Sequence, residues 1–299
     1  MTSSLLRPWG RGRTLTTGAG AADGPAAGRA QAAGSTAPTR ILDWRQPRVA
    51  ALVRGLDGAA PSAGDPADPA RQIEALHRAH RWISANVRPV YSVQDERPVS
   101  QVLRLGRGSC SQRLAVLESV ARASGVATRV RGLLVDGTFW YPRFPHLRRI
   151  VPDQVLLAWP EFRLGDPSAP GGPAPAWLTV SELLGGLRPA DTGGRGGFTN
   201  AGPETLFEAL SRTAIDWDAA PGACPVAGPG AGGGPGGGTG AGPGAGSAGP
   251  ACDLSAFVLA DLGHHDSRDE LFTRHGQTLC GMARLFAEPV LGRRAAGAA

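Results

Sequence analysis

The sequence predicts a single α+β domain with an antiparallel sheet and a pair of helices at its C-terminal end. Two stretches with helical periodicity come first, the second of them at 110–124. Two β-prone runs joined by Asp-Gly and a third β-prone run at 154–164 follow, before further helical stretches. This grouping of strands between groups of helices favours an α+β fold with an antiparallel sheet.

Composition and charge exclude several classes of protein. The chain has 299 residues and a net charge of +6, but its 31 basic residues are all arginine and are scattered, so we expect no nucleic-acid partner. No apolar run is long enough for a signal peptide or a membrane span, which predicts a cytoplasmic protein without a membrane partner. The four cysteines are widely separated and form no CxxC pair, so we expect reduced thiols and no zinc site.

Glycine, alanine and proline divide the chain into segments. We expect a disordered segment at 1–38, a main domain at 39–218 and a flexible Gly/Pro/Ala-rich linker at 219–250. A linker of this composition has little apolar surface to offset the entropy lost on ordering. A helical pair at 251–290 is expected to pack on the domain, and a disordered tail at 291–299 ends the chain.

The first strongly periodic helix begins after Asp68, which can cap it, with Pro69 at the first helical position and Pro89 just beyond its end. His80 falls on the apolar face of this helix. A histidine in that position is expected to be a hydrogen-bonded core residue rather than a ligand.

The second helix is expected from about Cys110 to Ser124, with Gly125 in the left-handed conformation after its end. Asp136-Gly137 then joins two β-prone runs and predicts a tight hairpin of the type I′ kind. Pro160 lies inside the third β-prone run, so we expect that strand to be an edge or to contain a bulge.

The later helices are predicted by their capping residues. Thr179 with Glu182 fits a capping box, and Pro203 suits the first turn of the helix after it. The stretches "CDLSAFVLADLG" and "SRDELFTRHGQTLCGMARLFAEP" are both expected to be helical.

Cys110 follows two spaced glycines and begins a predicted helix, in the stretch "GRGSC". A thiol at a helix N-terminus faces unpaired N–H groups and the positive end of the helix dipole, and both favour the thiolate. Taken alone, these residues favour a buried structural cysteine; the alternative is a nucleophile of lowered pKa.

Three motifs in order extend this pattern: "GSC" at 108–110, "ARASGVATRVRG" at 121–132 and "LAWPEF" at 157–162. Together they resemble the transglutaminase-like superfamily, which has a papain-like cysteine core. The resemblance implies that Cys110 is the nucleophile. It also places Leu157 where the family has its catalytic histidine, in a His-Ala-Trp-x-Glu motif. The family's third catalytic residue, usually an aspartate, has no clear match, although Asp166 is a candidate substitute.

The candidate site therefore combines a nucleophile with a relocated base. We expect Cys110 and His146 to be the catalytic pair, because His146 lies in the loop before the third strand. The expected substrate-binding residues are Trp140, Tyr141, Arg143, Trp159 and Glu161. The aromatic residues offer stacking surface, and the arginine offers a fork for carboxylate or phosphate. We expect no metal and no cofactor, since His264, His265 and His275 do not form a ligand set.

Two classes of function remain open at this point. The first is an enzyme of thiol acyl chemistry, which hydrolyses an amide or peptide bond or transfers an acyl group. The second is a catalytically inactive transglutaminase-like module that binds a peptide or a small molecule. Leu157 favours the second and the position of Cys110 favours the first. The sequence indicates no oligomeric state.

Overall fold

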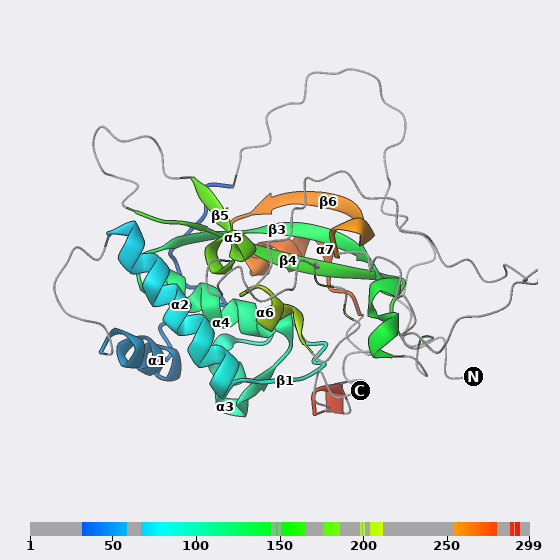
Figure 1. Cartoon of the computed structure of the whole chain (residues 1–299), viewed down its shortest axis with the longest axis horizontal. Coiled ribbons are helices and arrows are strands. Elements are labelled where there is room, and N and C mark those ends of the chain that lie inside the picture. The colour runs from blue at the N-terminus through cyan, green and yellow to red at the C-terminus, as the bar shows by residue number, and fades with distance from the viewer. Residues whose placement is uncertain are drawn as a thin grey trace, which may run out of the picture.

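The computed structural model describes residues 32–58, 67–144, 148, 151–165, 176–185, 198, 200, 204–211, 254–279, 288–289 and 291–293 of the chain. These residues form an α+β fold in which four helices near the N-terminus precede a four-stranded sheet. Helices α1 to α4 lie below the sheet in Figure 1. The predicted fold class is confirmed.

The main sheet has the strand order β5-β4-β3-β6, and every neighbouring pair is antiparallel. Its strands are β3 (Ala127–Asp136), β4 (Gln154–Arg163), β5 (Trp177–Thr179) and β6 (Val258–His265). A separate parallel pair consists of β1 (Arg88–Pro89) and β2 (Arg107–Gly108). The expectation that β4 is an edge strand or contains a bulge is wrong, because β4 lies between β5 and β3 and pairs with β3 without a register shift. β5 pairs only with Glu161 to Arg163, however, so Pro160 lies just beyond the part of β4 that has a partner on the β5 side. This position suits a residue without an N–H donor.

The helices of the main domain are α1 (Pro47–Asp57), α2 (Pro69–Asn86), α3 (Val99–Leu105), α4 (Cys110–Ala123), α5 (Val180–Leu184) and α6 (Leu206–Ala209). Of these helices, α2, α4 and α5 follow the sequence signals, α1 and α3 were not predicted, and α6 begins after Thr205 rather than at Pro203. The Asp68 side chain accepts a hydrogen bond from the backbone N–H of Ala70, and Gly125 has a φ of 82°. Thr179 and Glu182 form the expected capping box.

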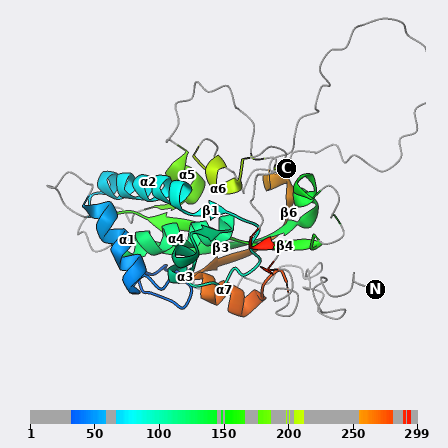
Figure 2. The same cartoon turned by 90° about the horizontal axis from the view of Figure 1, so that it is seen from below.

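The core is built around α4, which packs against β3, β4 and α2. Seen from below, α4 lies between α2 and a helix further along the chain, α7 (Arg268–His275) (Figure 2). Almost every side chain of α4 is buried, including several that are charged. Among the described residues, no helix is both long enough and apolar enough to span a membrane.

The predicted hairpin at Asp136-Gly137 is wrong. Residues Gly137–Arg143 form a 3-10 helix, η1, and β4 returns to pair with β3 only after a longer connection. Asp136 caps this helix by accepting a hydrogen bond from the backbone N–H of Thr138. Residue 137 must be glycine for a steric reason and not because of a hairpin turn. A Cβ there would lie 1.7 Å from the carbonyl oxygen of Pro152.

The first of the two expected C-terminal helices is also absent. Residues Leu254–Phe257 form a short 3-10 helix, η3, and the residues after it form β6. Pairing with β3 supplies backbone hydrogen bonds that compete with the helical ones, and tertiary context of this kind overrides local propensity. The second expected helix is present only in its first part, as α7, where Ser267 accepts a hydrogen bond from the backbone N–H of Glu270. α7 ends at His275, residues 276–279 are not helical, and residues 280–287 lie outside the described residues.

The folded part of the chain begins before residue 39. Ser35 forms an isolated antiparallel bridge with Thr128, through two backbone hydrogen bonds of 3.0 and 3.1 Å. Ile41 and Leu42 are fully buried in the core. The boundary expected at residue 38 therefore lies inside a segment that packs on the domain, while the expected linker at 219–250 lies outside the described residues.

Candidate functional site

Cys110 is the first residue of α4, and the local sequence determines this position. The Ser109 hydroxyl accepts a hydrogen bond of 3.2 Å from the backbone N–H of Gln112. The Gln112 side chain accepts one of 3.0 Å from the backbone N–H of Ser109, which completes a capping box. The Gln112 amide nitrogen also donates to the Ser92 hydroxyl and to the carbonyl of Gln94. The start of α4 is thus tied to the loop that follows β1.

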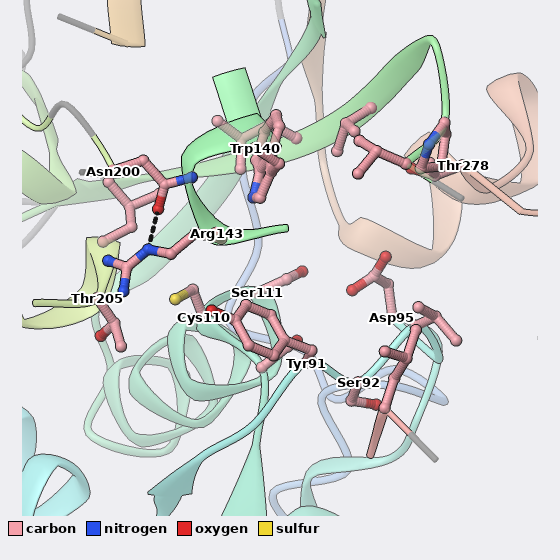
Figure 3. A pocket seen from close by; sticks show the side chains of 18 of the residues that line it. Tyr91, Ser92, Asp95, Cys110, Ser111, Trp140, Arg143, Asn200, Thr205 and Thr278 are labelled. Carbon is pink, nitrogen blue, oxygen red and sulfur yellow. Dashed lines mark hydrogen bonds between the residues drawn. The ribbon is translucent and has the colours of Figure 1, made fainter. Parts of the chain in front are cut away.

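The thiol lies in the wall of a cavity of about 230 Å³. The wall is mostly apolar, and its polar side chains include Asp95, Arg143, Asn200 and Thr205 (Figure 3). Its apolar lining comes from the loop after β1, from η1, from β4 and from the segment before α6. The apolar lining residues are Val90, Tyr91, Val93, Trp140, Phe144, Val151, Pro152, Val155, Leu156, Leu157, Phe198, Leu206, Leu279 and Leu291.

Burial raises the pKa of the Cys110 thiol above its ordinary value. The charge of Arg113 and hydrogen bonds from the Phe207 backbone and the Thr205 side chain act in the opposite direction, but they do not overcome the burial. The lowered pKa that the helix N-terminus predicts is therefore wrong in sign. A thiol of raised pKa is mostly protonated at neutral pH and is a weak nucleophile.

Helix α6 is held against the thiol by two buried side chains. The Nε2 of His80, on α2, lies 2.9 Å from the carbonyl oxygen of Phe207, at hydrogen-bond distance. The His80 ring also stacks on the Phe207 ring. Arg113 lies 4.2 Å over the Phe207 ring and pairs with Glu208. His80 is thus a hydrogen-bonded core residue, as expected, and burial lowers its pKa.

Leu157 lines the same cavity as Cys110 and is 7% exposed. The next two residues of the motif on the same side of β4 do not line it. Trp159 is fully buried in the core. Glu161 pairs with Arg129 at 2.6 Å and with His264 at 3.1 Å. Neither residue is placed to contact a ligand in this cavity.

The segment 140–143 contributes two of its three expected residues. Trp140 and Arg143 line the cavity, whereas Tyr141 is not part of the described lining and lies under the guanidinium of Arg148. The Nε of Arg143 donates a hydrogen bond of 2.7 Å to the Asn200 side chain. A second nitrogen, Nη2, donates to the carbonyl of Glu204.

His146, the expected base, lies outside the described residues. Of the described histidines, none lines the cavity. His264 binds Glu161, and His265 is buried with its ring against that of His275. In the described part of the chain, histidine, cysteine and acidic side chains nowhere cluster in a group that could hold a metal ion.

Several cavity residues could not be found from the sequence. Thr205 and Asn200 come from a part of the chain far from Cys110, and no spacing motif links them to it. Asn200 has a φ of 61°, a left-handed conformation that asparagine adopts more readily than most residues. Asp95 belongs to the loop after β1 and carries no local signal of a site.

The fold and the site define a class of protein: an α+β core with a cysteine at the start of its central helix, beside an antiparallel sheet. Residues 59–180 match the family model of the transglutaminase-like superfamily. The match covers the three motifs at 108–110, 121–132 and 157–162 and agrees with the resemblance that they indicated. No curated protein and no solved structure shows significant similarity to the chain.

Proposed function

We propose that this protein binds a small molecule or a peptide side chain in the cavity beside Cys110, without using the thiol as a catalyst. The surroundings of the thiol carry the proposal. Burial raises the pKa of Cys110, and Leu157, an apolar residue, forms part of the wall around it. Thiol catalysis needs a base to form the thiolate and an acid for the leaving group, and leucine can act as neither.

The size and character of the cavity support binding. Apolar protein cavities of about 150 Å³ accept a benzene ring. A volume of about 230 Å³ accommodates an aromatic ring with a short chain, or an alkyl chain of similar bulk. Burial of the ligand's apolar surface stabilises the complex by roughly 25 cal/mol per Å².

The second candidate is thiol acyl chemistry, either hydrolysis or acyl transfer to an amine, with His146 as the base. It is favoured by the position of Cys110 at a helix N-terminus and by the Phe207 backbone and the Thr205 side chain, both of which act to lower the pKa of its thiol. These are the groups that would stabilise a thiolate if a base reached it.

Calorimetry with 4-phenylbutyramide, a neutral probe, tests binding directly. The wild-type chain is expected to bind it, and Val155→Trp is expected to lose binding, because the indole would fill the cavity that Val155 lines. Leu259→Trp is the control, since Leu259 is 48% exposed on β6 and outside the described lining. Equal binding by wild type and Val155→Trp would refute the assignment of the cavity.

Turnover of p-nitrophenyl acetate separates the two candidates. The binding proposal expects the wild type and Cys110→Ser to release p-nitrophenol at the same slow rate. A wild-type rate well above that of Cys110→Ser establishes the enzyme instead. In that case His146→Ala identifies the base by abolishing the difference.

A further inference from the structure

We propose that the ligand of this cavity is an amphipathic carboxylate, with its anionic group at Arg143 and its apolar body along the wall formed by η1 and β4. This inference rests on the proposed function and specifies the ligand class. It follows from the charge of Arg143, the way its guanidinium is held and the mostly apolar wall beside it.

Arg143 is held in place by neutral groups. Its Nε donates to the Asn200 side chain at 2.7 Å, and Nη2 donates to the Glu204 carbonyl. The Asn200 amide nitrogen donates in turn to the carbonyl of Phe139 at 3.1 Å, which fixes the asparagine. The guanidinium is thus oriented before any ligand arrives, which reduces the entropy lost on binding.

No carboxylate of the described residues pairs with Arg143. Its neighbour Arg113, also close to Cys110, differs in this respect, because Arg113 pairs with Glu208. Of these two guanidinium groups, that of Arg113 has a carboxylate partner among the described residues and that of Arg143 has none. A cation beside an apolar wall binds an anion more strongly than it would in water, because the wall lowers the local dielectric constant.

The cation lies at one side of the cavity. Figure 3 shows Asp95 across the cavity from Arg143, with Cys110 and Trp140 between them. A carboxylate is attracted to the Arg143 side, so the ligand has one favoured orientation. Its apolar body then lies against Trp140, Leu156 and Leu157.

The test compares 4-phenylbutyrate with its neutral amide, 4-phenylbutyramide, in calorimetry on the full chain. A charge-assisted hydrogen bond predicts that the wild type binds the carboxylate at least about tenfold more tightly than the amide. Arg143→Met is expected to abolish this preference while the amide still binds. Arg148→Met is the matched control, because it removes one positive charge from a nearby exposed position outside the described lining, and its preference should remain.

Loss of the hydrogen bonds to Asn200 and Glu204 could unfold the site in Arg143→Met, so salt provides a second measurement on the wild type. High ionic strength should reduce carboxylate binding and leave amide binding unchanged. If the amide binds and the carboxylate binds no better, the inference fails and the proposed function stands. If neither probe binds, the proposed function fails with it.

Discussion

Burial and hydrogen bonding act on the pKa of Cys110 with opposite signs. The capping box at Ser109 and Gln112 places the thiol at the start of α4, where the helix favours the thiolate. The surrounding residues, which leave Cys110 partly buried, desolvate the sulfur, and this effect on the pKa is the larger one. The position of a cysteine on a helix therefore does not by itself establish a nucleophile.

Leu157→His is expected to lower the pKa of the Cys110 thiol, because an imidazolium beside the sulfur stabilises the thiolate. The thiolate fraction at neutral pH should rise by about tenfold for each unit by which the pKa falls, and the rate of alkylation by iodoacetamide should rise by less than that, because a less basic thiolate is less nucleophilic. The measurement is the pH profile of that rate in a chain whose other cysteines, Cys224, Cys252 and Cys280, are replaced by serine. In the wild type the rate should keep rising to a higher pH than in the same chain unfolded by denaturant.

Leu164→His is the control for that substitution. Leu164 follows β4, has the same 7% exposure as Leu157 and is not part of the described cavity lining. A histidine there should leave the alkylation profile unchanged. If Leu157→His also leaves it unchanged, Leu157 does not face the thiol as proposed.

At the scale of elements, a buried ion pair joins α7 to α4. Arg268 pairs with Glu118 at 2.5 Å, and both side chains are fully buried. Arg268 also donates to the Ser111 hydroxyl at 3.0 Å and to the Ala158 carbonyl at 3.3 Å. Ser111 follows Cys110 in the chain and Ala158 follows Leu157, so these hydrogen bonds from α7 help to hold both cavity residues in place.

Arg268→Met is expected to lower the free energy of unfolding by about 3–5 kcal/mol, because it leaves the Glu118 carboxylate buried without its partner. Adding Glu118→Leu should recover much of that loss, since no unpaired charge remains. Chemical denaturation of the two single variants and the double variant measures the coupling. Arg274→Met is the control on the same helix: its pair with Glu270 is exposed, and its loss should stay below about 1 kcal/mol. Additive losses in the double variant would contradict this account.

At the scale of the whole molecule, the core is continuous from residue 41 to α7, although long segments separate the parts that form it. The segment 32–38 pairs with β3, and β6 comes from beyond the expected linker. Stability is thus expected to depend on the two ends of the chain as well as on the region that matches the family.

Deletion of residues 226–249 should leave the melting temperature nearly unchanged, because their Gly/Pro/Ala composition supplies almost no apolar surface to bury. These residues lie outside the described part of the chain, so the prediction rests on composition. Thermal unfolding is the measurement, with deletion of residues 1–38 as the comparison. That deletion removes the Ser35–Thr128 bridge and should lower the melting temperature. A large drop for the 226–249 deletion without aggregation would show that the segment packs.

Features that depend on local interactions could be predicted from the sequence. Helices α2 and α4 begin and end near the residues that their capping signals indicate, because caps act within one turn of the chain. The capping box before α5 and the start of α7 were predicted for the same reason. The cysteine motif and the family resemblance are also properties of short stretches.

Features that depend on contacts between distant parts of the chain could not be predicted from the sequence. β6 is a strand because β3 offers it hydrogen-bonding partners, and residue 137 must be glycine because the carbonyl oxygen of Pro152 leaves no room for a Cβ there. The cavity gathers Asn200 and Thr205 around Cys110 from a segment that no spacing rule connects to it.

By itself the sequence determined the fold class, the main helices and the position of Cys110 at the start of α4. Tertiary structure alone decided the sign of the thiol's pKa shift, the residues that surround it and the separation of Glu161 from the cavity. The physical reason is range: capping and periodicity act over a few residues, whereas burial and charge depend on whatever the completed fold places nearby.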